Sequence, residues 1–121
     1  MKGPRMTYDS NNIFARILRK EIPCNLVYED DFVLSFHDIH PKAPVHILIL
    51  PKGAYLSAQD FYAKGSAEEI HRFHQVIPMI AEKCGVHETG YRLVANCGLN
   101  GGQEVPHFHM HLIGGAKLSG F

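Results

Sequence analysis

The sequence predicts an α+β domain, a five-stranded antiparallel sheet packed against one main helix, with a short helix near the N-terminus. Three observations predict this class. About five short segments have the composition of β-strands, whereas only one long segment has helical periodicity. Several of the links between strands are short, which favours antiparallel pairing. A chain of 121 residues is also long enough for one domain with a sizeable core.

The N-terminal part of the chain shows no regular pattern before residue 12. Residues 1–11 mix Gly, Pro, Ser and Asn, so we expect a flexible arm there and the folded domain over residues 12–121. Apolar residues at 13, 14, 17 and 18 then fit a short amphipathic helix, which Pro23 must end.

Two strand candidates follow, Leu26–Glu29 and Phe32–His37, and a turn at Asp30-Asp31 between them predicts a hairpin. The next strand, His46–Leu50, is an almost unbroken apolar run closed by Pro51, as is typical of a central strand covered on both faces. His46 at its start is unusual, because a buried polar ring needs a hydrogen-bond partner.

The main helix is predicted to begin at the capping box Ser66-Ala67-Glu68-Glu69 and to end at Gly85. Apolar residues from Ile70 to Cys84 keep a helical stripe, and Pro78 inside it predicts a kink or a break. Ser57–Ala63 could add a short helical turn. Two further strands are predicted near the C-terminus, at Tyr91–Asn96 and His107–Ile113.

The last of these strands alternates three histidines with large apolar residues. On a strand, His107, His109 and His111 point to one face, roughly 6.6 Å apart, while Phe108 and Met110 pack behind them. Three interpretations remain open: a histidine-rich exposed face, a metal site, or nucleophilic and acid–base catalysis.

The glycine-rich loop before this row favours phosphorus chemistry. Within the loop that begins at Gly98, Gly101-Gly102-Gln103 leads straight into the row, and its glycines can turn backbone N–H groups inward to form a concavity for an anion. A histidine nucleophile suits phosphorus, because the adduct becomes labile once the ring is protonated. The glycines alone would be equally consistent with a flexible turn.

The charged residues and the cysteines indicate which partners and which cellular compartment to expect. Lys plus Arg balance Asp plus Glu at 12 each, with no basic run longer than two residues, so a nucleic-acid-binding surface is not expected. Three scattered cysteines without a C-x-x-C pair argue against a disulfide framework or a cysteine-based zinc site, and for a reducing compartment. We expect no signal peptide and no membrane span, and hence a cytoplasmic protein.

The segment HFHMHLI at 107–113 matches the H-φ-H-φ-H-φ-φ signature of the histidine-triad (HIT) superfamily. FHDIHPKAPVHILILPK at 36–52 and YRLVANCGLNGGQEVPHFHMHLIGG at 91–115 resemble its Hint branch of nucleotide-binding hydrolases. The resemblance extends from about Asn12 to Gly115. The branch that resembles galactose-1-phosphate uridylyltransferase would have glutamine in place of His111.

The resemblance implies a HIT fold, usually a homodimer, with helices on one side of an antiparallel sheet. It also implies a purine nucleoside phosphoramidase that cleaves AMP- or GMP-linked P–N bonds through a covalent adduct on His109, with no cofactor or metal. His107 and His46 would support His109, and His111 would contact the phosphate and manage protons at the leaving group. The implied nucleotide-binding residues are Phe14, Phe36, His37, Asp38, Ile39, Asn96, Gly102, Gln103, Glu104 and Val105.

Three features depart from this pattern. Glu104 stands where animal members of the branch often have a serine that touches the phosphate. The tail from Ala116 to Phe121 does not match the best-known members, and Asn12 and Ala15 replace a zinc-binding cysteine pair found in some relatives. Two alternatives remain: a nucleotide-binding regulatory module with vestigial hydrolysis, and a dinucleoside polyphosphate hydrolase similar to the Fhit branch.

Overall fold

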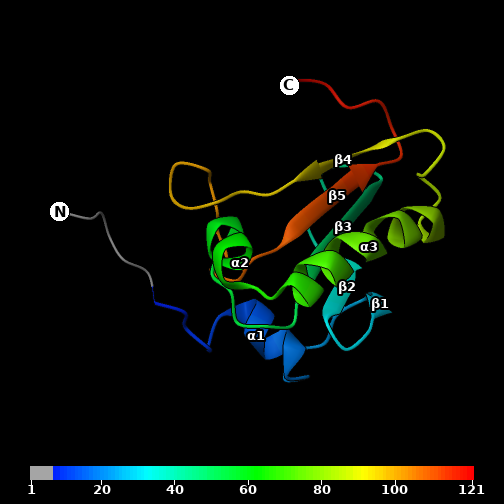
Figure 1. The fold of residues 1–121 in the computed structure, drawn as a ribbon. Coiled ribbons are helices and arrows are strands. Elements are labelled where there is room, and N and C mark those ends of the chain that lie inside the picture. The colour runs from blue at the N-terminus through cyan, green and yellow to red at the C-terminus, as the bar shows by residue number, and fades with distance from the viewer. Residues whose placement is uncertain (1–6) are drawn as a thin grey trace.

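The computed structural model describes residues 7–121 and contains one five-stranded antiparallel sheet with three helices (Figure 1). The strands lie in the order β1-β2-β3-β5-β4, so β3 is central and β1 and β4 are the edges. The elements are α1 (Ile13–Leu18), β1 (Leu26–Glu29), β2 (Val33–His37), β3 (Val45–Pro51), α2 (Ala58–Lys64), α3 (Ala67–Lys83), β4 (Tyr91–Val94) and β5 (Met110–Gly114).

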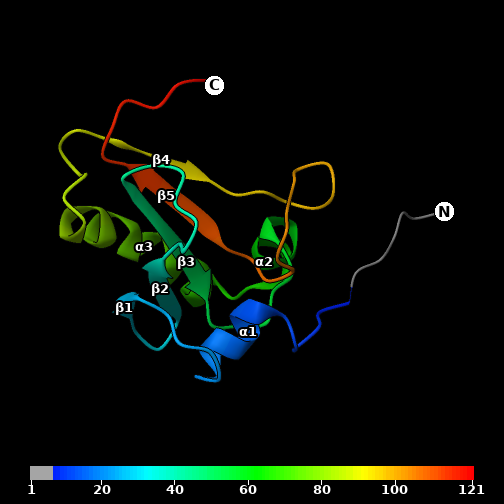
Figure 2. The ribbon, with the colours of Figure 1, turned by 180° about the vertical axis from the view of Figure 1, so that it is seen from behind.

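Both faces of the sheet are covered. Phe61 of α2 and Phe73 of α3 pack on one face against Ile47 and Ile49 of β3. Phe14 of α1 belongs to a second cluster, on the opposite face. Figure 1 shows α3 in front of the sheet and α2 beside the end of β5, and Figure 2 shows the sheet from behind. The expectation of helices on one side is therefore wrong for α1, whose apolar stripe covers the second face of β2 and β3.

The predicted elements are present, with shifted ends. The hairpin, the central strand and the Ser66–Glu69 capping box are confirmed, and the helical turn at 57–63 is the separate helix α2. The main helix continues through Pro78 without a break. The strand predicted over 91–96 ends at Val94, and the one predicted over 107–113 begins only at Met110.

The later start of β5 does not disturb the alternation of its side chains. Phe108 and Leu112 lie in the core between the sheet and helices α2 and α3, and Met110 packs against this core. The β3–β5 ladder begins at Ile49↔Met110, and the amide of Phe108 donates instead to the carbonyl of Tyr55, at 2.7 Å. His107 and His109 therefore precede the strand but keep its pleat.

The expected flexible arm at 1–11 falls partly outside the described residues, which begin at Thr7. Residues 8–10 instead form hydrogen bonds with the domain. Arg19 donates to the carbonyl of Ser10 at 2.7 Å, and Asn12 caps α1 by accepting from the amide of Ala15. Within 7–121, no helix is long and apolar enough to cross a membrane.

We predict that Phe108→Ala lowers the free energy of unfolding by about 3–5 kcal/mol, because the ring is 1% exposed and stacks on Phe61 at 5.0 Å. Urea denaturation followed by circular dichroism measures this loss. Leu99→Ala, at a side chain that is 90% exposed, should change it by less than about 0.5 kcal/mol. Equal effects of the two substitutions would contradict the packing described above.

Candidate active site

Two neighbouring strands, β3 and β5, bring His46 and His111 together. Leu48 lies opposite His111 in the ladder, and His46 is two residues earlier on the same face of β3. The two imidazoles meet across the strands, with Nε2 of His46 at 2.9 Å from Nδ1 of His111. This contact gives the buried His46 the partner that a polar ring in an apolar strand requires.

The hydrogen bonds determine which nitrogen of each ring carries the proton. The amide of Lys42 donates to Nδ1 of His46 at 3.0 Å, so the proton of a neutral His46 lies on Nε2. That N–H donates to Nδ1 of His111. The proton of a neutral His111 therefore lies on its own Nε2, which has no hydrogen-bond partner among residues 7–121. His111 presents a free N–H donor.

His109 has the opposite arrangement. Its Nδ1 lies 2.7 Å from the carbonyl oxygen of His107, so Nδ1–H donates and the lone pair resides on Nε2. Phe14 packs edge-on against the ring with centroids 4.9 Å apart, and the His109 and His111 centroids are 5.2 Å apart. The lone pair of His109 and the N–H of His111 thus belong to adjacent rings on one face.

His107 is completely buried and forms hydrogen bonds with both ring nitrogens. Its Nε2 lies 2.9 Å from the carbonyl oxygen of Pro51, and its Nδ1 lies 2.6 Å from the hydroxyl of Tyr8. The ring therefore cannot reach a substrate. His107 contacts His109 through its main-chain carbonyl.

Burial is the main electrostatic influence on these histidines. It lowers the pKa of His107 to about 4, and, with repulsion from His109 and His46, it lowers the pKa of His111 to about 4 as well. Burial also lowers the pKa of His109, against the effects of the His107 carbonyl and of the negative charges of Asp38 and Glu104. All three rings are neutral near pH 7.

Asp38 follows β2 and lies beside the paired histidines. One of its carboxylate oxygens accepts from the amide of His40 at 2.8 Å, and the other lies 3.4 Å from Nε2 of His46. Donor atoms of Asp38, His46 and His111 lie within 4.8 Å of one another and could hold a divalent cation. The metal interpretation of the 107–109–111 row is wrong for His107, whose nitrogens are both bonded within the protein.

The residues expected to bind a nucleotide differ in exposure. Phe14 and Phe36 are buried and pack edge to face, and Val105 packs against the same cluster. His37 is exposed at the end of β2, and Ile39 is 80% exposed in the loop after it. Of these residues, Phe14 packs directly against the His109 ring, and Phe36 packs behind Phe14.

The glycine-rich loop is closed by its own hydrogen bonds. The amides of Gly102 and Gln103 donate to the carbonyls of Leu99 and Gly98, both at 3.1 Å, so they do not form the expected anion concavity. Gly102 has φ +78°, and a Cβ on Gly101 would lie 2.4 Å from the carbonyl oxygen of Cys97, so the turn requires both glycines.

Side chains complete the bracing of this loop. Gln103 donates to the carbonyls of Leu56 and Val105 and accepts from the amide of Gly98. Asn96 donates to the carbonyl of Gly101 at 2.8 Å, whereas the Glu104 side chain is exposed. Gln103 and Asn96 therefore hold the loop in place, whereas the carboxylate of Glu104 is exposed to solvent.

Three further contacts were not predicted from the sequence. Two come from main-chain atoms, the amide of Lys42 and the carbonyl of Pro51, which no side-chain pattern can indicate. The third is the Tyr8 hydroxyl, in a segment whose polar composition had suggested an arm.

A family model described as "HIT domain" matches residues 19–118. The chain is 50% identical over 112 residues to an uncharacterized 13.2 kDa HIT-like protein of Azospirillum brasilense, covering 93% of this chain and 92% of that protein. It is 47% identical over 106 residues to the purine nucleoside phosphoramidase of Escherichia coli K12, covering 88% of each.

Solved structures give the same result. A histidine triad protein from Clostridium difficile superposes with a TM-score of 0.84 at 42% identity, covering 95% of this chain and 99% of that one. A HIT family hydrolase from Legionella pneumophila has a TM-score of 0.84 at 39% identity, covering 90% and 96%.

We predict that His107 makes the protein acid-labile. Its folded pKa of about 4 lies below the ordinary 6.5, so the unfolded chain binds its proton more readily. The stability it contributes is complete above pH 6.5 and is lost as the pH falls toward 4, by roughly 3 kcal/mol. Urea denaturation at several pH values in this range should show that the free energy of unfolding falls less steeply with pH in His107→Gln, which keeps a donor for the Pro51 carbonyl, than in the wild type. His87→Gln, at an exposed site, should follow the wild type; an unchanged slope in His107→Gln would contradict the prediction.

Proposed function

The chain belongs to the HIT domain family, whose relatives above include hydrolases, and we propose that it is a purine nucleoside phosphoramidase of the Hint type. It would cleave AMP- or GMP-linked P–N bonds. One observation carries the proposal: the His109 Nδ1–H donates to the His107 carbonyl, which leaves the Nε2 lone pair available beside the His111 N–H. A neutral nucleophile next to a hydrogen-bond donor is what attack on a phosphate ester or amide requires.

In the first step, Nε2 of His109 attacks the phosphorus. The bond from phosphorus to the leaving nitrogen breaks, and that nitrogen departs with the electron pair and one solvent-derived proton as an amine. His111 donates a hydrogen bond from its Nε2–H to the reacting phosphate or to the leaving group and keeps its proton. The His109 ring gains positive charge in the adduct, and the His107 carbonyl, 2.7 Å from Nδ1, stabilises that charge.

In the second step, water attacks the same phosphorus. The bond to Nε2 breaks, the ring recovers its electron pair, and water loses one proton to the solvent. The products are a nucleoside monophosphate and the free enzyme. The cationic adduct is a better leaving group than a neutral one, so the fixed Nδ1–H supports hydrolysis as well as attack.

Asp38 and the two phenylalanines supply the groups that a nucleoside needs. A carboxylate accepts hydrogen bonds from ribose hydroxyls, and Asp38 is only partly buried. Phe14, which packs against His109, and Phe36, which packs against Phe14, would form the apolar wall of the purine site. His37, Ile39, Asn96 and the segment 102–105 would complete the site, with Gln103 and Asn96 acting mainly by holding the loop.

We predict that the protein hydrolyses adenosine 5′-phosphoramidate and that His109→Ala lowers turnover about a thousandfold or more, because it removes the attacking atom. Mass spectrometry of acid-quenched protein should show a nucleotidyl adduct in the wild type and none in the variant. His87→Ala, which changes an exposed histidine, should retain wild-type turnover. A wild type without turnover and without the adduct would overturn the proposal.

The same samples separate the rival functions. A regulatory module would bind AMP in calorimetry with an affinity unaffected by His109→Ala, and would show negligible turnover. A metal enzyme using Asp38, His46 and His111 would lose activity with a chelator and regain it with zinc. A Fhit-like enzyme would prefer a dinucleoside polyphosphate, although the exposed carboxylate of Glu104 should repel a polyanionic leaving group.

We also propose a homodimer, supported by β4, an edge strand whose Leu93 is 42% exposed. We predict that light scattering at micromolar concentration gives twice the 13.6 kDa of one chain. Leu93→Lys should shift the mass toward one chain, whereas Leu99→Lys at the loop tip should not. A monomeric wild type would contradict this proposal without affecting the chemistry above.

A further inference from the structure

Tyr8 contacts the histidine row from outside the family domain. Its hydroxyl lies 2.6 Å from Nδ1 of His107, and its ring packs edge-on against that imidazole with centroids 5.6 Å apart. The family model begins at residue 19, and the two-step reaction above has no role for this tyrosine.

The direction of this hydrogen bond follows from the other side of the ring. Nε2 of His107 lies 2.9 Å from the carbonyl oxygen of Pro51, an acceptor only, so the proton of the neutral ring is on Nε2. Nδ1 is then an acceptor, and the Tyr8 hydroxyl must be the donor. Burial, which leaves His107 0% exposed, excludes water as a replacement donor in this conformation.

We propose that Tyr8 is a positioning residue for His109, an inference that rests on the phosphoramidase function proposed above. Tyr8 and Pro51 together fix His107 in one orientation and one tautomer. The carbonyl of His107 in turn accepts the Nδ1–H of His109 at 2.7 Å. Tyr8 therefore acts on the attacking nitrogen through one intervening residue and does not touch the substrate.

The attachment of Tyr8 supports this role. Four residues later Asn12, which is 8% exposed, donates to the carbonyl of Asp9 at 2.8 Å and caps α1. α1 carries Phe14, whose ring packs against His109 itself. The segment from Tyr8 to Phe14 thus contacts two of the three histidines, and its turn holds the hydroxyl at a defined distance from them.

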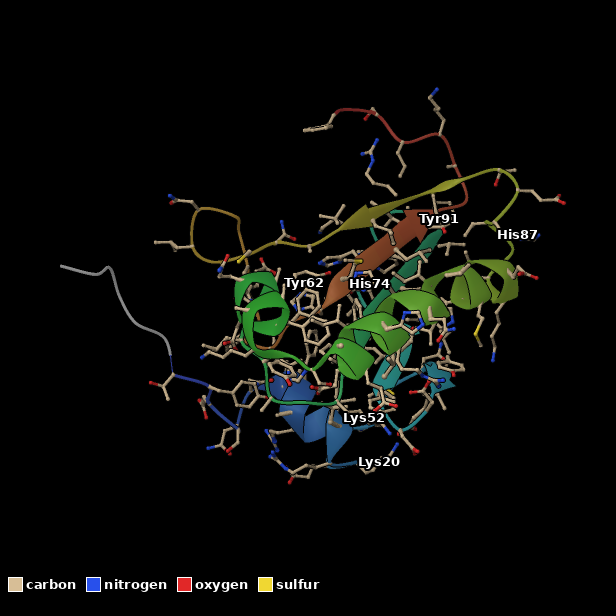
Figure 3. The ribbon with its side chains drawn as sticks, in the orientation of Figure 1. Lys20, Lys52, Tyr62, His74, His87 and Tyr91 are labelled. Atoms are coloured by element: carbon tan, nitrogen blue, oxygen red, sulfur yellow. The ribbon has the colours of Figure 1, made fainter. Side chains whose placement is uncertain are left out.

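Tyr8→Phe keeps the ring and removes only the donor. Tyr62→Phe is a matched control, because the Tyr62 hydroxyl also bonds a histidine, His74 Nε2 at 2.8 Å, but between α2 and α3 (Figure 3). We expect Tyr8→Phe to lower kcat for adenosine 5′-phosphoramidate about tenfold, the effect of one lost hydrogen bond, with KM changed less than about twofold. Tyr62→Phe should leave both constants unchanged.

Nuclear magnetic resonance gives a second readout that does not depend on turnover. In the wild type, imidazole nitrogen spectra should show His107 as the Nε2–H tautomer and His109 as the Nδ1–H tautomer. Tyr8→Phe should shift Nδ1 of His107 and the Nδ1–H proton of His109, whereas Tyr62→Phe should shift neither. A tyrosine that merely anchored the N-terminal segment would leave the His109 proton unchanged.

The outcomes separate the two proposals. Wild-type turnover with an unaltered kcat and an unshifted His109 proton in Tyr8→Phe overturns the role of Tyr8 and leaves the function standing. A wild type without turnover overturns the function, and the nitrogen spectra still decide whether Tyr8 reaches His109. An Nδ1–H tautomer of His107 in the wild type refutes the arrangement even if the variant fails to fold.

Discussion

Three buried imidazoles and the half-buried imidazole of His111 lie beside one face of the sheet, and the site depends on all four remaining neutral. Burial lowers the pKa of His46, His107, His109 and His111, so each ring has one donor nitrogen and one acceptor nitrogen. A wrong tautomer in any ring would place two donors or two lone pairs against each other. The pattern of protons is therefore a packing constraint as strict as the fit of the apolar side chains.

The different chemical roles of His109 and His111 arise because the two rings adopt opposite tautomers. His109 faces a carbonyl and so presents a lone pair, whereas His111 faces an N–H of His46 and so presents a proton. The difference comes from position in the fold, since the side chains are identical. The β3–β5 register maintains this difference, because a slip of one residue would turn the histidines toward the opposite face, on which α2 and α3 pack.

Much of this could be predicted from the sequence, for physical reasons. Alternation placed the three histidines opposite Phe108 and Leu112, and the capping box at Ser66 located the start of α3. Strand ends were less predictable, because the ladder at Met110 depends on a partner in β3 that local composition does not describe. The anion concavity expected at the glycine loop was not found, because the amides of Gly102 and Gln103 donate to carbonyls of the same loop, and the Gly98 amide donates to the Gln103 side chain.

Three main-chain atoms, the amide of Lys42 and the carbonyls of Pro51 and His107, determine which nitrogen of each ring carries its proton. Their contribution does not depend on the side chain that each residue bears. A substitution at position 42 therefore leaves this hydrogen bond in place unless the new residue is proline, which has no amide hydrogen, although it removes the Lys42 charge that helps to lower the pKa of His46 and His111.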